Sequence, residues 1–272
     1  MKNNMSTKFS LSIILPIKSA SPAFFEDYFK KAIDSVKNQD RKVDELIIVH
    51  CDETSLTEHL KSFDFSDINV KLLPWTEEPN FANQVNFGVQ SASSEWVSIF
   101  EFDDEYSKIW VENVKKYSEF HPDVDCFLPI VVDVDEKGLF AGFTNEATFA
   151  LNVSSEMGVL SNETLHQFQN FQLSGMAIKK TSYLDFGGLK SNFRLTFGYE
   201  FYLRMTHNSV KVMTIPRIGY KHINLRTGSI FWNYKNSENP LTEEEVKFWI
   251  ESAKKEYFFN NQRTINYEPQ VQ

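Results

Sequence analysis

The sequence predicts an α/β fold with a mostly parallel central sheet and helices on both of its faces. Short apolar runs rich in β-branched residues alternate with amphipathic stretches along residues 9–102, and this alternation is typical of a parallel sheet. Hydrophobic residues make up 42% of the 272-residue chain and aromatic residues 15%, so the chain can bury a large core. We expect one domain over residues 8–235, followed by a C-terminal helix and tail over residues 240–272.

Each predicted element of the N-terminal half follows from its side-chain pattern. Apolar runs of strand length predict four buried strands, at Phe9–Ile17, Asp44–Val49, Asn69–Leu73 and Trp96–Phe102. Apolar residues at helical spacing predict three helices between them, from Ser21-Pro22 to about Asn38, near Leu56–Ser62, and from Phe81 to Ala92. This order places the carboxyl ends of the strands at a common edge, where open α/β sheets bind ligands.

The C-terminal half is predicted to be less regular. Its expected elements are a helix at Trp110–Phe120, a hairpin of Asp125–Val134 and Leu139–Phe143, a strand at Leu173–Lys179, a helix at Phe197–Thr206, a strand at Val210–Ile215 and a helix from Glu243 to about Phe258. Asp133-Val134-Asp135 lies at the hairpin turn, where Asp is favoured, so we interpret it as structural. Residues 143–171 are polar with little periodicity, which predicts a long loop suited to binding a substrate.

Composition and charge exclude several classes of protein. The formal net charge of −9 argues against a nucleic-acid binder, which needs a basic face. Cys51 and Cys126 are too few for a disulfide framework and lack the spacing of a metal site. We find no secretory h-region and no apolar stretch long enough to span a bilayer. We therefore expect a cytoplasmic protein without a transmembrane segment.

The strand predicted at Trp96–Phe102 runs into four acids, Glu101, Asp103, Asp104 and Glu105. Side chains alternate between the faces of an extended strand, so Glu101 and Asp103 would point the same way if the strand continued to its end. Clustered carboxylates repel one another, and a divalent cation with oxygen ligands would offset the repulsion. The segment therefore predicts a metal-dependent site for a diphosphate-bearing substrate, with a solvated acidic loop as the alternative.

Seven short segments, taken in order, resemble the glycosyltransferases of family 2, which have the GT-A fold. They are Ser12–Pro16, Ala32–Gln39, Glu45–Val49, Asn86-Phe87-Gly88, Phe100–Asp104, Gly187-Gly188-Leu189 and Gly198–Leu203. Their order and spacing carry the resemblance, which extends over about residues 9–229. It implies an inverting transferase that moves a sugar from a nucleoside-diphosphate sugar, commonly UDP-linked, to a hydroxyl acceptor such as a glycan.

The resemblance also implies a role for each matching residue. Asp103 would be the principal ligand of Mn²⁺ or Mg²⁺, with Glu101 and His222 as further metal ligands. The residues expected at the nucleotide sugar are Pro16, Asp52, Asn86, Glu101 and Asp103. Glu200 would be the catalytic base, which takes the proton of the attacking hydroxyl, while the metal would stabilise the departing diphosphate as a Lewis acid.

Competing structural roles stay open for four of these residues. Glu101 could serve the fold instead of the metal, and His222 could be a polar core residue. Asp104 could belong to the metal site or cap the following helix. Glu200 lies in the first turn of its predicted helix, where an acid is favoured by the helix dipole. The C-terminal helix could pack on the domain or form a dimer.

Departures from the family's pattern keep two other functions open. Glu101 replaces an Asp, Tyr199 replaces a Glu, and His50-Cys51-Asp52 retains one acid of an acid pair, which is compatible with a non-catalytic relative that binds a sugar, a nucleotide or a partner. The other is a sugar-phosphate nucleotidyltransferase of similar fold. That class carries a Gly-rich stretch after the first strand, and Lys18–Pro22 contains no Gly.

Overall fold

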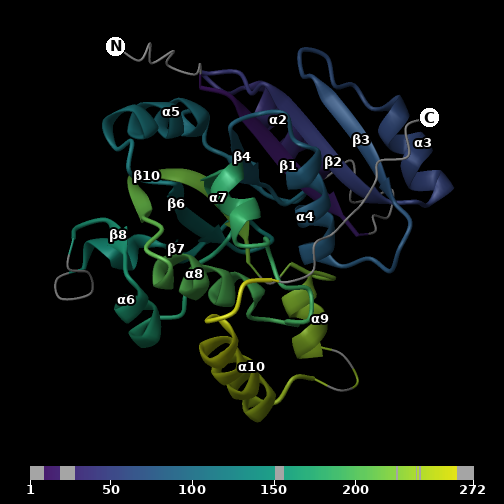
Figure 1. The fold of residues 1–272 in the computed structure, drawn as a ribbon. Coiled ribbons are helices and arrows are strands. Elements are labelled where there is room, and N and C mark those ends of the chain that lie inside the picture. The colour runs from purple at the N-terminus through teal and green to yellow at the C-terminus, as the bar shows by residue number, and fades with distance from the viewer. Residues whose placement is uncertain are drawn as a thin grey trace.

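A single mixed sheet organises the computed structural model, which describes residues 9–18, 28–150, 156–224, 226–236, 238 and 240–261 (Figure 1). From edge to edge its strands are β3 (Val70–Trp75), β2 (Glu45–Cys51), β1 (Leu11–Ile17), β4 (Trp96–Ile99), β9 (Ala177–Lys179), β6 (Cys126–Val134), β10 (Val212–Ile223) and β5 (Glu105–Tyr106). Two more strands lie off this path, β7 (Phe140–Thr144) beside β6 and β8 (Val159–Leu160) beside β10. The predicted α/β fold class is therefore confirmed.

The N-terminal half of the sheet is parallel, as predicted. In β1, Ile14 pairs with Ile47 of β2 and with Ile99 of β4. β9 is antiparallel to both of its neighbours, β4 and β6. Because β1, β2 and β4 run in one direction, Asp52 after β2 and Glu101 after β4 follow strand ends at the same edge.

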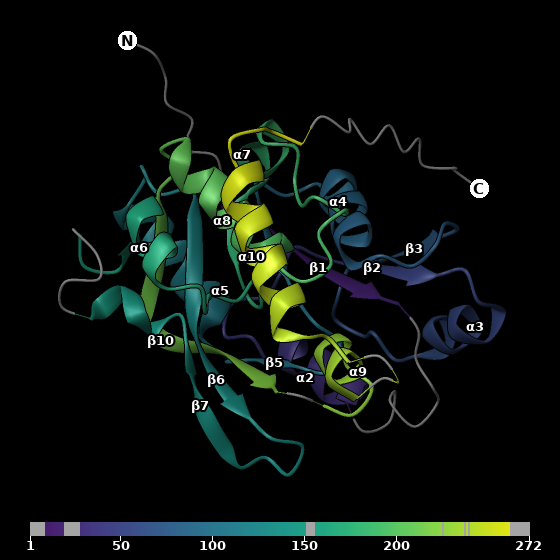
Figure 2. The ribbon, with the colours of Figure 1, turned by 90° about the horizontal axis from the view of Figure 1, so that it is seen from below.

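Helices cover both faces of the sheet (Figures 1 and 2). One face packs against α2 (Lys30–Lys37), α3 (Thr54–Ser62) and α5 (Trp110–Phe120). The other packs against α4 (Phe81–Ser91), α6 (Asn162–Gln167), α7 (Lys180–Asp185), α8 (Phe197–His207) and α10 (Glu243–Glu256). The alternation along β1 explains the two layers, because Ile13 belongs to the first core and Ile14 to the second.

Local sequence signals account for where several helices begin. The Asn80 side chain caps α4 by accepting a hydrogen bond from the Asn83 amide at 3.1 Å. Thr242 and Glu245 form the predicted capping box at the start of α10. Ala253 of α10 and Tyr257 at its end are buried in the core that also contains α8. This helix therefore packs on the domain.

The largest differences from prediction lie in the C-terminal half. Residues 143–171 were expected to form a loop, but their described part contains a short helix η2 (Glu146–Phe149), β8 and α6. Two further helices, α7 and α9 (Ile230–Asn236), were not predicted. β10 continues to Ile223, eight residues beyond the predicted end of the strand at Ile215, because it pairs with both β6 and β5.

Some of the predicted features concern residues that the structure does not describe. The expected helix cap at Ser21-Pro22 lies outside the described residues, as do most of the N-terminal segment and of the tail after Asn260. Among the helices that are described, none combines the length and the apolar character needed to cross a membrane.

Candidate functional site

A tight turn after β4 decides which acids come together. The strand ends at Ile99, and the Asp104 amide donates a hydrogen bond to the Glu101 carbonyl at 3.2 Å. A turn of this kind brings its first and fourth residues close together. The prediction that Glu101 and Asp103 share one side of an extended strand is therefore wrong, and Asp104 takes the place next to Glu101.

Glu101, Asp104 and His222 form the candidate metal group, because one ligand atom from each lies within 4.8 Å of the other two. His222 Nδ1 lies 2.9 Å from Asp104 Oδ2, and the Ile223 amide donates to Asp104 Oδ1 at 3.0 Å. The Ser174 hydroxyl donates to Glu101 Oε1 at 2.5 Å. The extension of β10 thus brings His222 to the acidic turn.

Burial and mutual repulsion perturb the acids of this region. Burial, and after it the Asp104 charge, raises the pKa of Glu101 to about 7. Burial alone would lower the pKa of His222, but the charge and hydrogen bond of Asp104, together with the charges of Glu101 and Asp103, outweigh it and raise that pKa to about 10. A carboxylate whose pKa is raised by its neighbours holds a proton that a cation can replace.

The donor set of this group fits a divalent cation. Two carboxylates supply the oxygen ligands that Mg²⁺ and Mn²⁺ prefer, and an imidazole is compatible with Mn²⁺. Asp104 and His222 lie within hydrogen-bond distance of each other, and a cation bound between them would replace this contact. Glu101 and His222 were both predicted as ligands from the sequence, whereas the third member, Asp104, was predicted with a helix cap as its alternative.

Asp103, predicted as the principal metal ligand, points to a different partner. It forms a buried ion pair with Arg226, whose Nε donates to Asp103 Oδ2. The Arg226 guanidinium also lies over the ring of Phe102, 5.3 Å from its centre. Burial and then the Asp104 charge raise the pKa of Asp103, although Arg226 lowers it. Within the same turn, Asp103 thus contacts Arg226, whereas Glu101 and Asp104 lie close to His222.

Glu200, predicted as the catalytic base, is fully buried inside α8. Its carboxylate forms ion pairs with Arg204 at 2.9 Å and with Lys190 at 3.0 Å. Arg204 also donates to the Gly188 carbonyl at 2.8 Å, so the pair fixes the turn before Lys190. A general base must reach the proton that it removes, and this arrangement argues against that role for Glu200.

The residues predicted at the nucleotide sugar separate into two groups. Asp52 is exposed directly after β2, at the edge that also carries Glu101, and Pro16 lies near the end of β1. Asn86, by contrast, is buried, and its side-chain amide uses both ends on the Leu189 backbone, at 2.8 and 2.9 Å. Asn86 therefore supports the Gly187-Gly188 turn and does not face a ligand.

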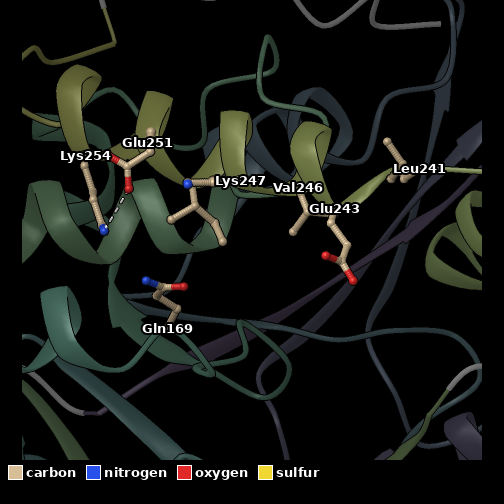
Figure 3. A pocket seen from close by; sticks show the side chains of 8 residues that line it. Gln169, Leu241, Glu243, Val246, Lys247, Glu251 and Lys254 are labelled. Carbon is tan, nitrogen blue, oxygen red and sulfur yellow. Dashed lines mark hydrogen bonds and ion pairs between the residues drawn. The ribbon is translucent and has the colours of Figure 1, made fainter.

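A cleft of about 180 Å³ lies beside the acidic turn. Its wall includes Asp103 and Glu105, the start of α2, the β6–β7 turn at residues 134–138, and Lys221 and Ile223 of β10. A larger hollow of about 400 Å³ runs along α10 and contains an ion pair between Lys254 and Glu251 (Figure 3). One residue that lines this hollow, Gln169, belongs to the segment 143–171 that was predicted to bind a substrate.

Sequence reasoning missed two partners of the site, Ser174 and Arg226. Ser174 follows an apolar residue in a segment predicted as strand and carries no motif. Arg226 belongs to none of the seven segments that carry the family resemblance. Both side chains contact the acidic turn, which is more than 70 residues away from each of them in the chain. No local sequence pattern indicates such contacts.

Comparisons with known proteins agree with this architecture. The family described as "Glycosyl transferase family 2" matches residues 12–174, more than half of the chain. A curated relative from Haemophilus influenzae, named "Uncharacterized glycosyltransferase", is 26% identical over 112 residues, which cover 40% of this chain and 35% of that protein. The match thus spans about a third of the length of that relative.

Two solved structures of S. aureus TarS, residues 1–349, are similar to this chain. The complex with UDP has a TM-score of 0.59 at 14% identity and covers 97% of this chain and 76% of that one. The complex with UDP-GlcNAc has a TM-score of 0.61 at 13% identity and covers 90% and 71%. At such identities the likeness concerns the fold alone. Together with the family match, it shows that this chain belongs to the family 2 glycosyltransferases and has their GT-A fold.

Proposed function

We propose that this glycosyltransferase moves a sugar from a UDP-linked donor to a hydroxyl acceptor with inversion, and that it needs a divalent cation, Mn²⁺ or Mg²⁺. The convergence of Glu101, Asp104 and His222 carries the proposal. These side chains come from two segments more than 100 residues apart. Two carboxylates with an imidazole this close repel or share protons unless a cation joins them.

Each residue of the group has a distinct task in this proposal. When bound, a divalent ion supplies positive charge to a departing diphosphate. Glu101 and Asp104 would hold the ion with their carboxylates, and His222 would release its proton and offer a ring nitrogen. Ser174 and the Ile223 amide orient the two carboxylates through the hydrogen bonds described above, which fixes the position of the diphosphate relative to the cleft.

The acceptor would approach through the cleft beside Asp103. A single displacement requires a carboxylate that can take the proton of the attacking hydroxyl, and Glu200 is closed off by Arg204 and Lys190. Asp103 lines the cleft and follows Glu101 by two residues. We assign the role of general base to Asp103. Its carboxylate can accept the proton of the attacking hydroxyl once its ion pair with Arg226 opens.

The nucleotide would lie at the opposite end of the strand edge, near Asp52 and Pro16. The solved TarS complexes contain UDP and UDP-GlcNAc, which supports a uridine nucleotide for this chain as well. Asp52 is exposed at the end of β2, where open α/β sheets bind their ligands.

The experiment that tests the proposal compares Asp104→Asn and His222→Ala with the parent enzyme. Titration calorimetry should show that UDP binding strengthens when Mn²⁺ is added to the parent, and that this dependence is lost in both variants. Release of UDP from UDP-GlcNAc should fall by about a hundredfold. Glu119→Gln is the control, since Glu119 is exposed on α5 and pairs with Lys115. If the affinity of the parent for UDP is the same with and without Mn²⁺, the proposal is overturned.

The burial of Glu200 favours a second candidate, a relative that binds a nucleotide sugar without turning it over. The same experiment separates the two functions. A binding protein would show Mn²⁺-dependent affinity for UDP-GlcNAc and would release no UDP with any acceptor, whereas an enzyme would release UDP and lose this activity in Asp103→Asn without losing Mn²⁺-dependent UDP binding.

A further inference from the structure

In the proposed function the nucleotide lies near Asp52 and Pro16, whereas the cleft beside Asp103 is formed by other elements. Its walls come from the start of α2, the turn between β4 and β5, the β6–β7 turn and the end of β10. Apart from Tyr28, which lies between β1 and α2, none of its described lining residues comes from β1, β2 or β3 or from the loops that follow β2 and β3. On the proposed function, on which this inference rests, the cleft therefore takes the acceptor.

The carboxylates that line this cleft are already engaged. Asp103 pairs with Arg226, and Glu105 pairs with Lys221. Asp135 Oδ1 accepts hydrogen bonds from the amides of Lys137 and Leu139, at 2.9 and 2.8 Å.

The fourth acid of the cleft, Glu136, accepts a hydrogen bond from the Thr227 amide at 2.6 Å. These contacts tie the acids to the backbone or to basic side chains. None of these contacts involves the ammonium group of Lys31 or Lys137.

Two lysines of the cleft wall stand apart from this pattern. In the described part of the chain, the ammonium groups of Lys31 and Lys137 have neither an ion pair nor a hydrogen bond, and both side chains are exposed. Lys31 comes from α2 and Lys137 from the β6–β7 turn, so they approach the cleft from two separate walls. The neighbouring Lys30 differs, because it pairs with Asp34 at 2.7 Å.

The β6–β7 turn that carries Lys137 extends away from the body of the molecule (Figure 2). It is joined to the site through the Glu136–Thr227 hydrogen bond, since Thr227 follows Arg226. A ligand held by Lys137 would therefore lie between this projecting turn and the acidic turn after β4.

We propose that Lys31 and Lys137 bind an anionic group of the acceptor, a phosphate or a carboxylate, while its hydroxyl faces the acidic turn. Two ammonium groups on opposite walls can each donate a charge-assisted hydrogen bond to one anion. The donor diphosphate does not fill this role, because its place is at the metal group and the nucleotide edge. The enzyme would thus prefer a negatively charged acceptor, in spite of the net charge of −9 on the chain.

Three small probes test this assignment on the 272-residue chain. Glycerol 3-phosphate carries a phosphate, glycerate carries a carboxylate, and glycerol carries neither. Titration calorimetry of each probe, with and without saturating UDP and Mn²⁺, is compared for the parent, the double variant Lys31→Ala/Lys137→Ala and the control Lys30→Ala. Thermal unfolding checks that the variants fold, which we expect because the side chains replaced are exposed.

At least one anionic probe should bind the parent and the control, glycerol should not, and the double variant should bind the anion about tenfold more weakly. UDP affinity should stay the same in all three proteins. The anion that binds more tightly identifies the group as phosphate or carboxylate. The assignment is overturned if neither anion binds the parent, if the double variant binds as tightly as the parent, or if the anion displaces UDP. Failure of the proposed function would appear separately, as a parent that does not bind UDP with Mn²⁺.

Discussion

At the scale of single residues, burial and the neighbouring acids raise the pKa of Glu101. Its carboxyl is held by Ser174 and lies beside Asp104, and its pKa rises from 4.5 to about 7. Between these two values the folded chain keeps a proton that the unfolded chain releases. The free energy of unfolding contributed by Glu101 therefore falls as the pH rises through this window.

The variant Glu101→Gln removes this titration. In the presence of a chelator we expect it to be more stable than the parent at pH 7, with a melting temperature about 2–4 °C higher. Its stability should also depend less on pH between about 4.5 and 7. Thermal unfolding across this range measures both effects, with Glu105→Gln as the control. Equal pH slopes for the parent and Glu101→Gln would contradict the prediction.

Replacement of Glu200 should lower the stability of the fold, because its carboxylate forms two buried ion pairs. Glu200→Gln would leave Arg204 and Lys190 buried without their carboxylate, and breaking a buried ion pair in this way costs about 3–5 kcal/mol. We expect denaturant unfolding to show a loss of that size. The exposed acid Glu244 on α10 supplies the control, Glu244→Gln. A catalytic base would instead give an inactive protein of unchanged stability.

At the scale of elements, the close contact of α4 with the sheet depends on Gly88. A Cβ at this position would lie 2.5 Å from Ile14 Cγ2 and 3.1 Å from Val49 Cγ2. Gly88→Ala would gain about 1 kcal/mol in helix propensity but would push α4 against the buried side chains of Ile14 and Val49, and overpacking costs about 1–3 kcal/mol. We expect a net loss of stability in denaturant titration.

The matched control for this prediction is Gly142→Ala in β7, where a Cβ would meet no atom within 4 Å. Its stability should stay close to that of the parent. If Gly88→Ala were as stable as Gly142→Ala, the contact between α4 and β1 would be looser than the structure shows.

The elements also show where sequence reasoning succeeds. The helix Trp110–Phe120 was predicted with the bounds that the structure gives, because its apolar spacing is local information. The strand from Trp96 was predicted three residues too long, because Phe100 and Phe102 continue the alternation of a strand while the chain already turns. His222 was placed beyond a strand that in fact contains it, since the extension of β10 depends on pairing with distant strands.

At the scale of the whole molecule, the C-terminal helix α10 packs on the domain that precedes it. Tyr257 and Ala253 complete the core that also contains α8, and the Lys190 ammonium donates to the Glu256 carbonyl at 2.7 Å. In Figure 2, α10 crosses over α8 and covers this side of the domain. Long-range packing of this kind could not be predicted, because the helix pattern indicates an apolar face but not its partner.

A chain that ends at residue 239 should therefore be strongly destabilised. Removal of one large aromatic side chain from a core costs about 3–5 kcal/mol, and this truncation removes Tyr257 together with its neighbours. Calorimetry should show one unfolding transition for the full chain and a much lower melting temperature for the truncated one. An unchanged melting temperature, or two separate transitions in the full chain, would count against a shared core.

The turn after β4 has a consequence for how roles are transferred between relatives. Because the chain reverses between Glu101 and Asp104, two neighbouring acids face different partners, His222 for Asp104 and Arg226 for Asp103. Inserting or deleting one residue in this turn would exchange those partners while leaving the letters of the motif almost unchanged. An alignment that matches acids by position alone can thus assign the role of one carboxylate to its neighbour.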